Sequence, residues 1–168
     1  LERHIKGCLD YWGEDAKNVF DPIQKALQLS SGKDRLYYIE VSDSNTSGMD
    51  YEPGNNKTKF HGFLHSTGAS NKKSANSGGS FGIGKAAYFA MSPSRSIIVS
   101  TMTQEGVHTF QGVSMLCTHT VNDVLRTPIG FYSTNNENPV VDVDEIPYQF
   151  KRTEPGTSIN IMGVQITS

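Results

Sequence analysis

The chain has 168 residues, of which 36% are hydrophobic, and a formal net charge of −2. This length suffices for one domain with a single core and is too short for two ordinary domains. A nucleic-acid-binding surface is usually marked by an excess of Lys and Arg, so the balanced charge argues against DNA or RNA binding by this segment.

The Cys and His residues give no sign of a metal centre or of a disulfide framework. Cys8 and Cys117 lack the close spacing of a ligand pair. Only His61 and His65 lie near each other among the histidines, and we interpret them as polar loop residues. No apolar run approaches the roughly 18 residues that span a bilayer, and the first residues are not signal-like. We therefore expect a soluble cytoplasmic protein that does not contact a membrane.

The N-terminal part of the chain predicts two helices. Apolar residues recur at helical spacing in 1–12 and again in 19–27, with Gly13 between the two stretches. The run Ser30-Ser31-Gly32 predicts the end of the second helix. No N-cap residue precedes the first helix and the first residue is Leu rather than Met, so we expect an N-terminally truncated part of a longer protein.

Strand signals dominate the rest of the chain. Residues 35–42 are rich in β-branched and aromatic side chains and end in a polar turn. Residues 96–103 and 107–116 flank the turn Gln104-Glu105-Gly106 and predict a hairpin. Further strands are expected at 130–133 and 157–162. Without regular βαβ units, this order predicts one α+β domain, a two-layer α/β sandwich with a mixed, largely antiparallel sheet.

The segment from Tyr51 to Ser80 is dominated by Gly, Ser, Asn and Lys. This composition predicts a long mobile loop, and such loops inside compact domains are usually lids or linkers. Directly after Gly84, the run KAAYFAMS predicts a short helix that ends at Ser92-Pro93.

Three glycines, Gly79, Gly82 and Gly84, stand just before that short helix. Closely spaced glycines let backbone N–H groups approach an anion, and the helix dipole adds to the attraction. The sequence therefore predicts a phosphate site. The same run also satisfies the P-loop pattern GxxxxGK, but Ala86 stands where that motif needs a hydroxyl for Mg²⁺, and a polar stretch replaces the buried strand before it. We disfavour the P-loop interpretation.

The run GSFGIG resembles the GxxGxG box of the GHKL ATPases, the group of gyrase B, heat-shock chaperone, histidine kinase and MutL. It is most similar to the box of the ninety-kilodalton heat-shock chaperones. The resemblance implies a Bergerat-type ATP-binding fold in which the loop contacts the phosphates and hinges a lid, here residues 51–80. The implied contacts are Gly79, Phe81, Gly82, Ile83, Gly84 and Lys85.

The strand ending IEVSD and the turn after it resemble the DxGxG box of the same group. Asp43 matches the Asp that accepts a hydrogen bond from the adenine amino group, and an ionised carboxylate can only accept, which favours ATP over GTP. Asn45 stands where the family has Gly, but Asn tolerates left-handed backbone geometry. The resemblance further implies nucleotide contacts at Gly48 and Met49, and Thr157 matches a threonine that lines the adenine pocket.

Hydrolysis in this family needs a helix with the pattern ExxxN. Its Glu activates water and its Asn holds the Mg²⁺ that bridges the phosphates. Glu14 fits as the catalytic residue and Asn18 as the Mg²⁺ ligand. The family, however, places a strand between this helix and the strand of the adenine Asp, whereas the residues after Pro22 look helical. The alternative is a Glu/Asn helix upstream of Leu1, without which this chain would not hydrolyse ATP alone.

The resemblance implies a switch that is operated by ATP and Mg²⁺. Nucleotide would order the lid, a second protomer or another protein partner would respond, and hydrolysis would occur in the parent protein. Two alternatives stay open. The first is a histidine-kinase catalytic domain, although no phosphoacceptor helix is visible. The second is a non-enzymatic scaffold module that has lost nucleotide binding, which the altered turn at Asn45 would fit.

Overall fold

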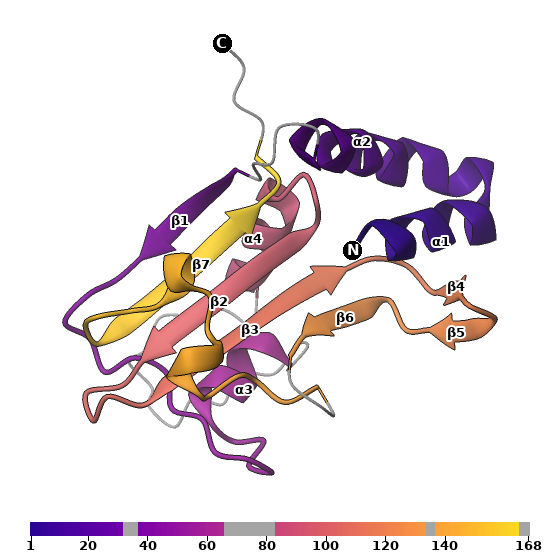
Figure 1. Ribbon diagram of the computed structural model, residues 1–168. Helices are drawn as coiled ribbons and strands as arrows, with labels where there is room; N and C mark the ends of the chain where they lie inside the picture. The colour runs from indigo at the N-terminus through magenta and orange to yellow at the C-terminus, as the bar shows by residue number, and fades with distance from the viewer. Residues whose placement is uncertain (32–36, 66–82, 134–136, 165–168) are drawn as a thin grey trace.

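The computed structural model of the chain describes residues 1–31, 37–65, 83–133 and 137–164. They form an α+β fold in which helices accompany a five-stranded sheet (Figure 1). The elements in chain order are α1 (Glu2–Trp12), α2 (Glu14–Ser31), β1 (Tyr38–Ser42), α3 (Lys59–Leu64), α4 (Ile83–Met91), β2 (Ser96–Met102), β3 (His108–Met115), β4 (His119–Val121), β5 (Val124–Arg126), β6 (Ile129–Tyr132), the 3-10 helices η2 (Val143–Glu145) and η3 (Tyr148–Phe150), and β7 (Gly156–Met162). The predicted helices and strands are confirmed within the described residues.

The main sheet has the strand order β1-β7-β2-β3-β6, and β4 and β5 form a separate two-stranded ribbon. Strands β2 and β3 form the predicted hairpin, which the bond from Thr103 N to Val107 O closes at 3.0 Å. All four pairings of the main sheet are antiparallel. The parallel pair that a mixed sheet requires is thus absent from the described part of the chain.

One face of the sheet is covered by α3 and α4. Because side chains alternate along a strand, every second residue of β2, β3 and β7 points to this face. The face carries the first core cluster, made of Phe60, Leu64, Phe89, Ile97, Val99, Val113 and Ile159. These helices anchor the chain on either side of residues 66–82, which lie outside the described residues.

Helix α3 corrects the prediction of a continuous loop over Tyr51–Ser80. Thr58 caps the helix by accepting a hydrogen bond from His61 N. Phe60 and Leu64, one helical turn apart, are buried in the first core cluster. The polar composition of the surrounding residues concealed this short amphipathic turn.

The opposite face of the sheet is covered by the segment that contains η2 and η3. This face carries a second cluster, made of Phe110, Val140, Ile146, Phe150 and Met162. Val140 exchanges backbone hydrogen bonds of 2.8 Å with Phe110 of β3, which fixes the segment to the sheet. The central strands β2, β3 and β7 are therefore packed on both faces, whereas the edge strand β1 is largely exposed.

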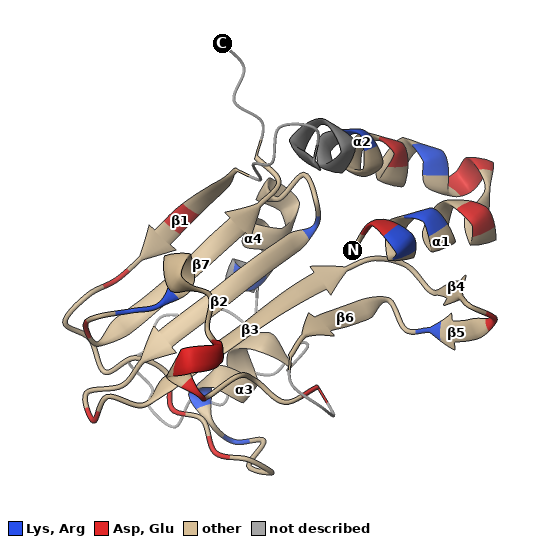
Figure 2. Cartoon of the chain, viewed as in Figure 1, with Lys and Arg blue, Asp and Glu red and all other residues tan. Residues whose placement is uncertain are grey.

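Helices α1 and α2 form a hairpin with its own apolar cluster beside the β4–β5 ribbon (Figure 1). Gly7 allows a close approach, because a Cβ there would lie 2.7 Å from the carbonyl oxygen of Thr120. His4 Nδ1 lies 2.9 Å from His119 Nε2, and Trp12 Nε1 donates to Thr118 O at 2.6 Å. Acidic and basic residues are interspersed along both helices (Figure 2). None of the described helices combines the length and apolar character needed to cross a membrane.

Candidate functional site

Asp43 follows β1 directly and is held by the first residues of β7. Asp43 N donates to Thr157 O at 2.9 Å, and Thr157 N donates to Asp43 Oδ1 at 2.8 Å. Thr46 Oγ1 donates to the same Oδ1 at 2.8 Å. The exposed carboxylate is thereby fixed through one oxygen, while its Oδ2 accepts no hydrogen bond from the described residues. That oxygen could accept a hydrogen bond from a ligand.

Asn45 has a φ of 58°, in the left-handed region. Its N–H donates to Pro155 O at 3.0 Å, so the turn is tied to the loop before β7. Asn visits this region far more readily than most residues. The left-handed backbone that was expected at Asn45 is therefore observed, whereas the match of this turn to the DxGxG box stays a prediction.

Gly48 lies where the turn passes over the end of β2. Its φ is 62°, and a Cβ there would lie 2.3 Å from the carbonyl oxygen of Met102. Only glycine fits this combination of left-handed backbone and close approach. Met49, the next residue, packs against the first core cluster, and its N–H donates to Thr101 Oγ1 at 2.8 Å.

Thr101 joins the turn to β7, a role that the sequence analysis missed. Its buried hydroxyl donates to Gly156 O at 2.9 Å and lies 3.1 Å from Thr157 Oγ1. With the bond from Met49 N, the hydroxyl uses its one donor and both acceptor positions. Gly156 is required for a steric reason, because a Cβ there would lie 2.3 Å from Asp43 O. The structure thus brings together Asp43, the turn to Met49, and Thr157.

Helix α4 lies along the sheet with its N-terminus toward this site. Directly after the helix, Ser92 Oγ donates to Met162 O at 2.7 Å, at the end of β7 remote from Asp43. From there α4 extends back along β7 and β2 (Figure 1), so its N-terminus is directed toward the Asp43 end of the sheet. Lys85 lies half-buried in the first turn, and burial lowers the pKa of its ammonium group.

The glycine box is covered only in part. Gly79, Phe81 and Gly82 lie outside the described residues, whereas Ile83 and Gly84 form the first residues of α4. The phosphate contacts expected at all of these residues and at Lys85 stay predictions.

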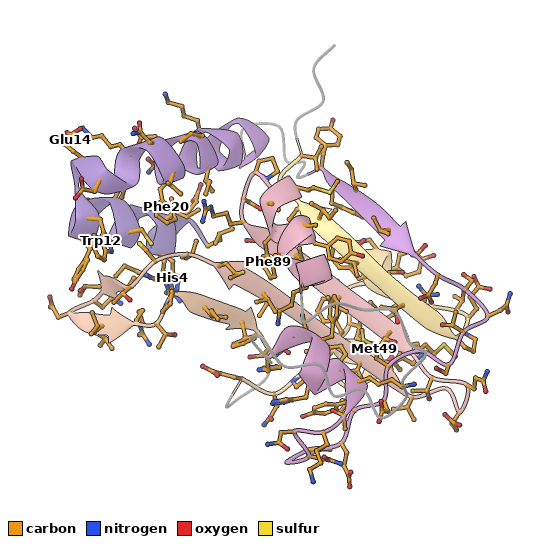
Figure 3. All side chains as sticks on the ribbon, turned by 180° about the vertical axis from the view of Figure 1, so that it is seen from behind. His4, Trp12, Glu14, Phe20, Met49 and Phe89 are labelled. Carbon is orange, nitrogen blue, oxygen red and sulfur yellow. The ribbon has the colours of Figure 1, made fainter. Side chains whose placement is uncertain are left out.

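Glu14 and Asn18 lie in the first turns of α2, and both are exposed. Glu14 accepts a hydrogen bond from Lys17 Nζ. Figure 3 shows Glu14 at the opposite end of the molecule from Met49. The structure does not bring the motif-based catalytic pair to Asp43.

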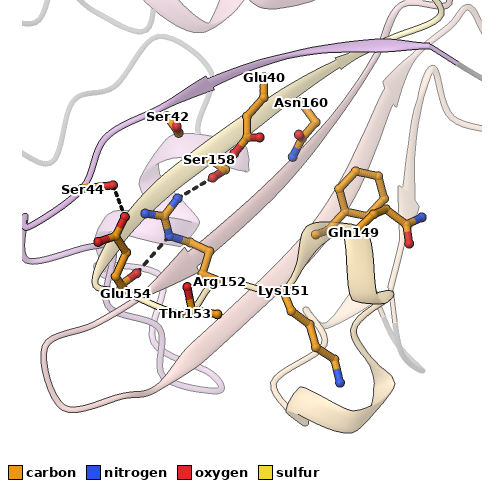
Figure 4. Close-up of a pocket in the computed structure, with 11 residues that line it drawn as sticks. Glu40, Ser42, Ser44, Gln149, Lys151, Arg152, Thr153, Glu154, Ser158 and Asn160 are labelled. Carbon is orange, nitrogen blue, oxygen red and sulfur yellow. Dashed lines mark hydrogen bonds between the residues drawn. The ribbon is translucent and has the colours of Figure 1, made fainter.

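Two polar pockets lie near the candidate site without including Asp43 or Thr157. One of about 200 Å³ lies on the η3 side of the sheet, between β1, β7 and residues 149–154 (Figure 4). The other, of about 240 Å³, is lined by residues that include His61 and His65, whose rings stack at 4.7 Å. Across the described residues, no group of three or more His, Cys, Asp or Glu side chains could hold a metal ion.

Comparison of the chain with models of protein families, with curated proteins and with solved structures finds no match. Its function is therefore inferred from the geometry around Asp43 and from the resemblance of its motifs.

Proposed function

We propose that the chain binds ATP as the nucleotide-binding part of a GHKL-type ATPase, with a Bergerat-type two-layer sandwich as its fold. The observation that carries the proposal is the fixed carboxylate of Asp43. Two donors, Thr157 N and Thr46 Oγ1, converge on Oδ1, whereas Oδ2 accepts no hydrogen bond from the described residues and would be the acceptor for a ligand. A carboxylate held in one orientation before the ligand arrives loses little conformational entropy on binding.

The chemistry of this carboxylate favours adenine. Oδ2 of Asp43 would accept a hydrogen bond from the exocyclic amino group, and a bond to a charged acceptor contributes about 1.5 to 3 kcal/mol. Guanine and hypoxanthine present a keto oxygen at the equivalent position, which would face the carboxylate without a proton between them. Thr157 Oγ1 and the turn at Gly48 and Met49 would line the rest of the base pocket.

The phosphates would lie at the N-terminus of α4. The N–H groups and the dipole of a helix N-terminus favour an anion. Lys85 adds a cation in the first turn. Burial lowers the pKa of this side chain, and an added phosphate would raise it again by favouring the charged form.

Hydrolysis is not assigned to the described residues. It requires a group that activates water and a ligand for the Mg²⁺ that bridges the phosphates. Glu14 and Asn18 match those roles by motif alone, and Glu14 lies far from Met49 of the Asp43 turn (Figure 3). The lid, the hydrolytic activity of a parent protein and the response of a second protomer are proposals that rest on the resemblance.

Calorimetric titration of a non-hydrolysable ATP analogue with Mg²⁺ tests the proposal. Asp43→Asn should weaken binding about tenfold or more, because the charged acceptor is lost. Asp123→Asn is the matched control, since Asp123 lies in the β4–β5 turn with a φ of 59° that Asn also adopts. Equal affinity of all three proteins, or equal affinity of the unaltered chain for ATP and GTP, would refute adenine recognition by Asp43.

A further inference from the structure

Arg152 lies behind the Asp43 turn, on the face of the sheet opposite to α3 and α4. Its guanidinium donates three hydrogen bonds. Nη2 donates to Asp43 O at 2.7 Å. Figure 4 shows the other two, from Nε to Glu154 O at 3.2 Å and from Nη1 to Ser158 Oγ. Ser158 directly follows Thr157, whose N–H holds the Asp43 carboxylate. One side chain therefore connects β7, the loop before it, and the backbone of Asp43.

The loop before β7 is also tied to the turn by a side-chain hydrogen bond. Glu154 Oε1 accepts a hydrogen bond from Ser44 Oγ at 2.6 Å. Ser44 follows Asp43 directly, so this bond lies beside the one from Arg152 to Asp43 O. Gly156 makes the approach possible, because a Cβ there would lie 2.6 Å from Arg152 Nη2. The planar guanidinium offers five donors in a fixed geometry and suits such a clamp, whereas a lysine ammonium does not reproduce it.

Arg152 binds the carbonyl of Asp43 and makes no ion pair with its carboxylate. This distinction matters because a guanidinium on the carboxylate would occupy the acceptor that a base needs. All three acceptors of Arg152 are neutral. The arrangement fixes the backbone from which the carboxylate projects and leaves Oδ2 to the ligand.

We infer that Arg152 is a positioning residue for base recognition: from the far face of the sheet, it sets the orientation in which Asp43 selects an amino-bearing purine over a keto purine. The inference rests on the proposed function. Arg152 does not touch the nucleotide, so its loss should reduce the preference between bases rather than the affinity for triphosphate.

The experiment compares the dissociation constants of ATP and ITP, which differ in the amino or keto group of the base, for the unaltered chain and its variants. We expect the unaltered chain to prefer ATP by about tenfold or more. Arg152→Ala should bring the ratio close to one, with ITP affinity changed less than about threefold, since that variant loses only the orientation of the carboxylate. Asp43→Asn in the same background should then add little, because both changes remove one function.

Lys151→Ala is the matched control for charge. Lys151 is the neighbouring cation of the same pocket, pairs with Asp144 Oδ1 at 3.9 Å, and is not among the partners of Asp43. This variant should keep the ATP preference. If Arg152→Ala loses its cooperative unfolding transition, Arg152→Lys serves as the test variant instead. It retains the charge but not the three hydrogen bonds of the guanidinium, so its preference for ATP over ITP should fall about threefold or more.

The outcomes separate the two proposals. A chain that prefers ATP and keeps that preference in Arg152→Ala, or in Arg152→Lys where the alanine variant is unfolded, overturns the role of Arg152 alone. Equal losses of ATP and ITP affinity do the same, since they indicate a general structural role. A chain without any preference for ATP overturns the proposed function and this inference together.

Discussion

Substituting Gly48 by alanine should destabilise the chain more than the same substitution at Gly54. Both glycines have left-handed backbones, with φ of 62° and 76°. They differ in space: a Cβ at Gly48 would lie 2.3 Å from Met102 O, whereas one at Gly54 meets nothing within 4 Å. The pair therefore separates the cost of backbone conformation from the cost of contact.

The expected magnitudes follow from these two terms. A non-glycine residue in the left-handed region costs about 1 to 2 kcal/mol, which is the whole effect expected for Gly54→Ala. For Gly48→Ala, the strand end at Met102 must also move by about an ångström, and such overpacking adds about 1 to 3 kcal/mol. At about 2 to 4 °C per kcal/mol for a chain of this size, the two melting temperatures should differ measurably.

The assay is urea and thermal unfolding of both variants, followed by far-ultraviolet circular dichroism. Gly48→Ala should have the lower free energy of unfolding by about 1 to 3 kcal/mol. Equal destabilisation of the two variants would show that the turn does not lie against Met102 as described.

Three further predictions concern the packing around the site and the helical hairpin. Thr101→Val should lower the free energy of unfolding in a urea titration by about 1 to 3 kcal/mol, because it leaves the buried partners of the hydroxyl unpaired. The buried hydroxyl of Thr109 has no partner in the described residues, so Thr109→Val should be neutral or stabilising in the same titration. Burial lowers the pKa of His4 below its ordinary 6.5, so the unfolded chain protonates first. The contribution of His4 to the free energy of unfolding should be fully present above pH 6.5 and should be lost as the pH drops toward the lowered pKa. If the urea midpoint of His4→Gln depends on pH in the same way as that of the unaltered chain, this prediction is refuted. Burial raises the pKa of Cys8 to about 12, so its thiol should react slowly with iodoacetamide at pH 8 and the half-buried Cys117 should be modified first. Peptide mass spectrometry measures the labelling of each thiol, and equal labelling of both would contradict this prediction.

The regular elements could be predicted because their periodicity is local. The helices on either side of Gly13 and the β2–β3 hairpin follow from apolar spacing and turn residues within a few positions. Helix α3 was missed because its two buried residues are surrounded by polar sequence. Strands β4 and β5 were missed because three residues are too few to show an alternation.

The candidate site was predictable only where a motif is continuous in sequence. Asp43 and Asn45 lie in one turn, so their roles could be stated from the residues around them. Thr101 and Arg152 gain theirs from long-range pairing, the former through the register of β2 with β7 and the latter across 109 positions of the chain. Nothing in their local sequence distinguishes them from ordinary strand and loop residues.

The most direct test of ATP binding at Asp43 is a two-dimensional amide NMR titration of the labelled chain with ATP and Mg²⁺. The proposal predicts that the amide signals of Asp43–Met49, Thr157 and Lys85 shift together with one dissociation constant, while those of Glu14 and Asn18 stay in place. Absence of any shift, or shifts confined to α1 and α2, would contradict the assignment of this site to ATP.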